Sequence, residues 1–170
     1  MIQYEKYEPL IEGPFKSVDE AIGEAANALK FIKIFIPTAK LVIGGSVSFY
    51  NHFPKDGEDI TINDIDALLI CNRSSSIMAH HWAATRPAGT FKLLPDGTYI
   101  VPVGDVDLHI TCPSKIMLVL NELTECDITE KHGVFLYNKK LTYSFYKSLN
   151  REKDQAKLQR MKNYKMTECQ

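Results

Sequence analysis

The feature that most constrains the fold is a pair of aspartates at the start of an apolar strand. Residues 64–71, DIDALLIC, alternate between polar and apolar side chains at first, and side chains two apart on a strand point to the same face. Asp64 and Asp66 therefore share one face, while Ile65 and Ala67 face the opposite way. Two adjacent carboxylates repel unless a positive charge lies between them. The pattern predicts a strand over residues 64–71 whose acidic face binds a hard divalent cation such as Mg²⁺.

A second acidic strand is predicted at residues 105–111. Here Asp105, Asp107 and His109 alternate with the apolar residues of the sequence GDVDLHI. If this strand pairs with the strand at residues 64–71, three or four carboxylates come together on one patch of the sheet.

A Gly-Gly-Ser turn precedes the first acidic strand and follows an apolar strand predicted at residues 40–43. Gly44 and Gly45 permit close approach of the backbone, and Ser46 is expected to cap a helix over residues 47–53. The free N–H groups at a helix N-terminus form a natural seat for phosphate. Alone, the turn fits a plain strand–turn–helix connection, but beside two acids it indicates phosphate binding.

In this order, the three pieces resemble the DNA polymerase beta-like nucleotidyltransferase superfamily. The matching residues are Gly44-Gly45-Ser46, Asp64-Ile65-Asp66 and Val106-Asp107-Leu108, within residues 17–125. The resemblance implies an α+β fold with a small mixed β-sheet that carries the acidic site and helices packed on one side. It also implies an enzyme that moves a nucleoside monophosphate from an NTP to an acceptor hydroxyl and releases pyrophosphate.

The resemblance also implies roles for individual residues. Asp64 and Asp66 would bridge two Mg²⁺ ions, with Mn²⁺ as a substitute, and Asp107 would hold the ion that activates the acceptor. The turn of residues 44–46 would cradle the β- and γ-phosphates of the NTP. Asp105 is either a turn residue or an acid at the rim of the site. His109 either orients a carboxylate or is a hydrogen-bonded inner histidine.

Length and composition favour an ordinary soluble domain. The 170 residues are 45% hydrophobic and 24% charged, which suits one domain with a sizeable core. No apolar run approaches the ~20 residues of a membrane span, so no membrane partner is expected. The first residues include acids and lack an apolar run, so no signal peptide is expected. Four scattered cysteines favour reduced thiols in the cytoplasm.

The other elements are predicted from periodicity, caps and turn residues. Ser17 and Glu20 form a capping box, and Trp82 is expected either to pack or to stack on a base. The predicted elements are helices over residues 17–36, 77–84 and 113–123, a hairpin over 90–103, a strand over 134–137 and a helix from 142 onward.

Charge divides the chain unevenly. The net charge is −1, but residues 139–165 hold nine Lys and Arg against two Asp and Glu. Residues 1–138 are therefore interpreted as the catalytic domain, and residues 139–170 as a basic arm packed on it or extending from it. Such an arm could hold a nucleic-acid backbone, lie solvated, or dock an acidic protein.

The acceptor stays open between an RNA or DNA end, a protein side chain and a small molecule, with nucleic acid slightly favoured. Two other function classes compete with the transferase. One is a non-catalytic regulatory protein that binds a nucleotide or a partner and retains the fold. The other is a metal-dependent nuclease, which does not explain the Gly-Gly-Ser turn.

Overall fold

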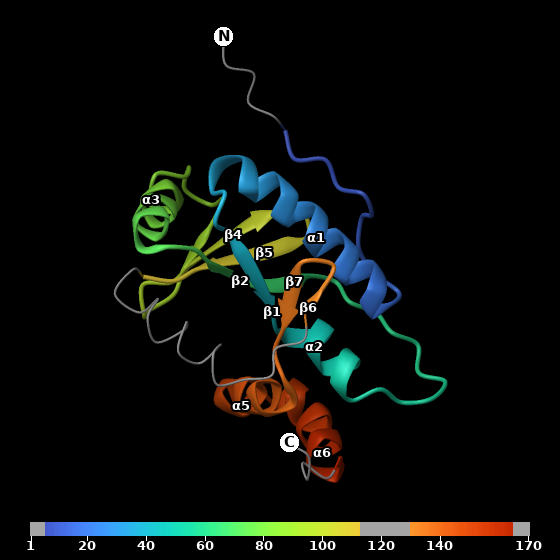
Figure 1. Ribbon diagram of the computed structural model, residues 1–170. Helices are drawn as coiled ribbons and strands as arrows, with labels where there is room; N and C mark the ends of the chain where they lie inside the picture. The colour runs from blue at the N-terminus through green and yellow to red at the C-terminus, as the bar shows by residue number, and fades with distance from the viewer. Residues whose placement is uncertain (1–5, 113–129, 165–170) are drawn as a thin grey trace.

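The strands among the described residues form one mixed sheet. The computed structural model describes residues 6–112 and 130–164 (Figure 1). Its strands are β1 (Lys40–Ile43), β2 (Ile65–Ile70), β3 (Lys92–Leu93), β4 (Tyr99–Val103), β5 (Val106–Ile110), β6 (Glu130–Lys131) and β7 (Val134–Leu136). They lie in the order β3-β4-β5-β2-β1-β7-β6. The pairs β2–β5 and β1–β7 are parallel and the other pairs are antiparallel.

The described helices are α1 (Val18–Phe35), α2 (Gly45–His52), α3 (Arg73–Ala84), α5 (Lys139–Leu149) and α6 (Gln155–Asn163), with a 3-10 turn at Glu152–Asp154. The predicted cap of α1 by Ser17 is confirmed: Ser17 Oγ accepts from the Glu20 amide at 3.1 Å. The Glu20 carboxylate accepts from the Lys16 amide at 2.7 Å rather than from the Ser17 amide, so the capping box is only half formed. These helices and the mixed sheet confirm the expected α+β class. None of the described helices is both long and apolar enough to cross a membrane.

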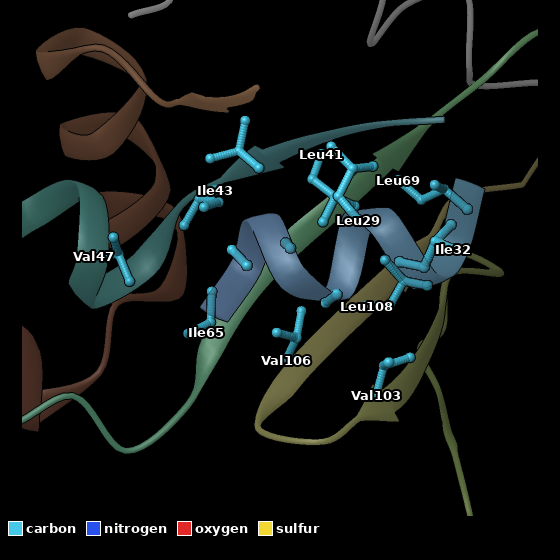
Figure 2. Close-up of a cluster of buried hydrophobic side chains, with 14 of the residues drawn as sticks. Leu29, Ile32, Leu41, Ile43, Val47, Ile65, Leu69, Val103, Val106 and Leu108 are labelled. Atoms are coloured by element: carbon cyan, nitrogen blue, oxygen red, sulfur yellow. The ribbon is translucent and has the colours of Figure 1, made fainter. Parts of the chain in front are cut away.

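The main core lies between one face of the sheet and α1. Figure 2 shows Leu29 and Ile32 of α1 beside sheet residues such as Leu41 and Leu108. Ala79 and Ala83 of α3 belong to the same buried cluster. Helices α1 and α3 thus cover one face, and the alternation along β2 and β5 leaves their polar side chains on the other.

The two C-terminal helices have a small core of their own. Phe49 and Phe53 pack with Tyr146 of α5 and with Leu158 and Met161 of α6, apart from the main cluster. In Figure 1, α2 lies between the sheet and these two helices. The basic arm predicted from residue 139 onward is therefore packed on the domain through α2 as far as the structure describes it.

Several element boundaries differ from the sequence-based expectation. Helix α3 begins at Arg73 rather than residue 77, because Asn72 Oδ1 caps it by accepting from the Ser75 amide at 2.9 Å. The helix expected from residue 142 begins at Lys139 and ends at Leu149, followed by Asn150 as its C-cap with a φ of 44°. The hairpin is present in shorter form, as β3 and β4. The helix expected over residues 113–123 lies outside the described residues.

Candidate functional site

Two of the predicted acids are direct cross-strand neighbours. In the parallel pairing of β2 with β5, Asp66 lies opposite Asp107, and Ile65 lies opposite Val106. Both aspartates are half-buried, whereas Ile65 and Val106 are fully buried on the α1 face. The sequence alternation therefore gives the predicted result, a pair of carboxylates on the face opposite the main core.

The third predicted acid, Asp64, lies one residue before β2 rather than inside the strand. Its side chain is exposed, and its charge acts on both Asp107 and Lys157. Asp64 is thus in the same electrostatic neighbourhood as the Asp66–Asp107 pair.

Gly45 brings the Gly-Gly-Ser turn against the acidic pair. Its φ is +57°, and a Cβ built there would lie 2.5 Å from Asp66 Oδ2. Only glycine combines this backbone conformation with such a close approach. The turn therefore lies directly beside Asp66, and a shared site of the turn and the acids stays a prediction.

His109 holds the carboxylate of Asp66. Its Nε2 lies 3.2 Å from Asp66 Oδ1, and the two side chains are 23% and 35% exposed, respectively. Of the two roles left open by the sequence, the contact favours orientation of a carboxylate.

The pKa of Asp107 is raised above its ordinary value. Burial is the largest cause, followed by the charges of Asp64 and Asp66, while His109 and Lys92 act in the opposite direction. Burial and neighbouring like charges both disfavour the ionised carboxylate, and a cation bound at the patch would offset the effect of the like charges.

The expectation that Ser46 caps α2 is wrong. The helix begins one residue earlier, at Gly45, and its N-cap is Gly44, which has no side chain to accept a hydrogen bond. The Gly44 N–H donates to the Asp66 carbonyl at 3.0 Å, so it is committed to the backbone. A Cβ at Gly44 would lie 2.8 Å from the Tyr137 ring. Gly44 therefore shapes the turn, and Gly45 and Ser46 supply the first N–H groups of the helix.

Two residues of the C-terminal helices, Lys157 and Tyr146, lie beside the Gly-Gly-Ser turn. Lys157 Nζ donates to Ser46 Oγ at 3.2 Å and contacts the Tyr146 hydroxyl at 3.1 Å. Burial lowers the pKa of Lys157, and burial raises the pKa of Tyr146 to about 12. The arrangement adds a cation and a hydroxyl to the predicted phosphate seat.

Sequence reasoning did not single out Lys157 or Tyr146 for this site. The available signal was the aromatic and then basic composition of residues 143–165. That pattern predicts a helix with a charged face, but it does not identify which lysine reaches a turn more than a hundred residues earlier.

Other candidates lie outside the site. Asp105 is in the β4–β5 turn and accepts from the Gly13 amide at 2.7 Å, which confirms the turn interpretation. Trp82 is 42% exposed and does not lie in the core. The Arg86 guanidinium lies over the Trp82 ring, 5.0 Å from the ring centroid. His80 contacts the Gly97 carbonyl at 3.1 Å.

The donor set suits Mg²⁺ only in part. Among the residues that the structure describes, no group of three or more His, Cys, Asp or Glu side chains converges closely enough to hold a metal ion. The adjacent Asp66 and Asp107 carboxylates fit a different arrangement, in which Mg²⁺ takes one or two carboxylates and completes its shell with water and substrate phosphates. Asp66 and Asp107 would hold such an ion, with Asp64 nearby.

Comparison of the chain with protein-family models, with curated proteins and with solved structures finds no match. The functional argument therefore depends on the residues and their geometry.

Proposed function

We propose that the protein is a metal-dependent nucleotidyltransferase with a nucleotidyltransferase fold. It would move a nucleoside monophosphate from an NTP to an acceptor hydroxyl and release pyrophosphate. The observation that carries the proposal is the close approach of the Gly45 backbone to the Asp66 carboxylate, whose cross-strand neighbour is Asp107. It supports the proposal because the turn that we expect to bind phosphate lies directly beside two carboxylates.

Different residues of this chain would bind the phosphates and the metal ion. The first N–H groups of α2, the Ser46 hydroxyl and the Lys157 ammonium would bind the β- and γ-phosphates and stabilise the leaving pyrophosphate. Asp66, oriented by His109, and Asp107 would hold Mg²⁺, which supplies charge neutralisation and activation of the acceptor hydroxyl. Asp64 would contribute from the exposed edge of the site.

The raised pKa of Asp107 adds a proton-transfer role. A carboxyl group with a raised pKa is better suited to accept the acceptor hydroxyl's proton than one with an ordinary pKa. Asp107 would act in this way only when it is not bound to the metal ion. We expect the acceptor to approach from the β5 side of the pair, because the phosphate seat occupies the α2 side.

The acceptor stays open between an RNA or DNA end, a protein side chain and a small molecule. A nucleic-acid acceptor is slightly favoured, because exposed lysines of the C-terminal segment, such as Lys147 and Lys153, could bind a phosphate backbone. A cytoplasmic location is proposed with it, because scattered thiols fit a reducing compartment.

The test is release of pyrophosphate from each of the four NTPs with Mg²⁺ and candidate acceptors. Activity should disappear in the double variant Asp64→Asn plus Asp66→Asn and persist in Asp56→Asn, an exposed loop acid that controls for the loss of surface charge. Turnover that survives the double variant would refute the proposal.

A non-catalytic nucleotide-binding protein is the second candidate. The absence of a preformed group of three metal ligands among the described residues favours it. It predicts saturable NTP binding with no pyrophosphate release under any metal, which the same assay detects.

A further inference from the structure

A groove beside α2 adjoins the phosphate seat through Lys157 but does not include the acidic pair. Its volume is about 700 Å³, and it lies between α2, the loop of residues 54–58 and α6. This volume is within the range of about 300–1,000 Å³ that small-molecule sites occupy. The carboxylates of Asp66 and Asp107 do not line it.

The groove lies beyond the phosphate seat along α2. Phe49 lies three residues after Ser46, Pro54 lies eight residues after it, and both line the groove. With a helical rise of 1.5 Å per residue, the groove begins about 4.5 Å along α2 from Ser46 and continues past the end of the helix. In-line transfer needs the donor's α-phosphate at the acids, so a nucleoside in this groove is a different molecule from the donor.

Aromatic rings and cations line the groove together. Tyr50 is half-buried with Lys157 Nζ 5.8 Å from its ring centroid, and Tyr164 is 38% exposed with Lys139 Nζ 6.0 Å from its ring centroid. Each ring therefore leaves only part of its surface to a ligand in the groove. Tyr164 is fixed by donating its hydroxyl to the Pro54 carbonyl at 3.0 Å. Lys55 is exposed on the loop, and Lys157 lines the inner end.

The cations are not equally available. Arg160 is neutralised by Glu58, whose two carboxylate oxygens lie 2.9 and 2.8 Å from its Nη1. By contrast, the hydrogen bonds described for the Lys157 ammonium go to the hydroxyls of Ser46 and Tyr146 rather than to a carboxylate. The ion pair of Arg160 shapes the wall, whereas Lys55 is exposed. Lys157, whose Nζ lies 5.3 Å from the Phe49 ring centroid, has no carboxylate among its described hydrogen-bond partners and is shared with the phosphate seat.

We propose that this groove binds a nucleoside monophosphate, as a second nucleotide site. The base would stack on the rings of Tyr50 and Tyr164, and the phosphate would lie between Lys55 and Lys157. Stacking on aromatic rings accepts every base, and lysine ammonium groups bind phosphate as point charges. Lys157 also donates to Ser46. A phosphate bound in the groove would therefore contact an ammonium group that also belongs to the phosphate seat of the first site.

The test is titration of a fluorescently labelled AMP, followed by anisotropy, in EDTA. Chelation removes the Mg²⁺ that donor binding at the acids requires, so the result does not depend on the proposed reaction. We expect saturable binding that weakens about tenfold or more in Lys55→Glu, because a phosphate contact becomes a repulsion. Lys55 is on an exposed loop, so this variant should keep its fold; an unchanged thermal melt verifies it.

Two variants and two competitors complete the design. Binding should be unchanged in Lys162→Ala, which removes an exposed α6 lysine outside the groove, and in Asp66→Asn, which alters the first site. Unlabelled AMP should compete better than adenosine or inorganic phosphate alone. No saturation by about 10 mM, full binding in Lys55→Glu, loss in Asp66→Asn, or equal competition by phosphate would each overturn the proposal.

Discussion

Replacement of Gly45 with alanine tests the contact that joins the turn to the acids. A Cβ at this position would lie 2.5 Å from Asp66 Oδ2, whereas ordinary contacts begin at 3.4 Å. The carboxylate would have to retreat by about 0.9 Å from its position beside His109, and a misplacement of about 1 Å can cost about 100-fold in rate. The positive φ adds about 1–2 kcal/mol of lost stability for a residue with a Cβ.

Gly57→Ala is the matched control. Gly57 has a φ of +71°, and nothing lies within 4 Å of the Cβ that alanine would add. Both variants should therefore lose about 1–2 kcal/mol in urea unfolding, but only Gly45→Ala should lose about 100-fold in pyrophosphate release. Equal activity in the two variants would refute the argument that Gly45 positions Asp66.

Three further variants test the electrostatics. Burial and like charges raise the pKa of Asp107 in the folded protein. Protonated Asp107 therefore stabilises the fold below the pKa that it has in the unfolded chain. This stabilisation is lost as the pH rises through the pKa of Asp107 in the folded protein. Asp107→Asn should therefore be inactive yet more stable than the wild type at pH 7 in urea unfolding, with a flatter pH dependence in weak acid. Burial lowers the pKa of Lys157, so the wild type should gain stability as the pH rises into the alkaline range, and Lys157→Met should lack this gain. In calorimetry, Lys157→Met should bind triphosphate about tenfold more weakly. Glu58→Ala leaves Arg160 without its carboxylate partner and should cost about 1–3 kcal/mol, whereas an unfolding midpoint equal to that of Lys162→Ala would contradict this.

The sequence predicted the acidic patch well because the alternation of residues is a local property. A period of two in residues 64–71 and 105–111 determines which side chains share a face, and the pairing of two such strands is the natural way to bury their apolar sides. The parallel direction and the register that place Asp66 opposite Asp107 do not follow from that pattern, because a shift of two residues would keep the same side chains on the same face.

The sequence predicted the ends of helices and the distant contacts less well. Ser46 looked like a cap, but the helix begins at Gly45 because glycine tolerates the positive φ that the turn requires. Lys157 reaches Ser46 only because the small cluster of Phe49, Tyr146 and Leu158 docks the C-terminal helices on α2. Such a contact depends on tertiary packing, which no local periodicity encodes.

Because the C-terminal helices have a separate core, we expect them to detach on heating before the sheet unfolds. Segments with few buried apolar contacts open at a lower free energy than the whole domain, and α5 and α6 are anchored through a cluster distinct from the main one. Detachment of these helices would withdraw the Lys157 ammonium while the strands stay paired. Affinity for polyphosphate should then decline at temperatures where circular dichroism still reports an intact sheet.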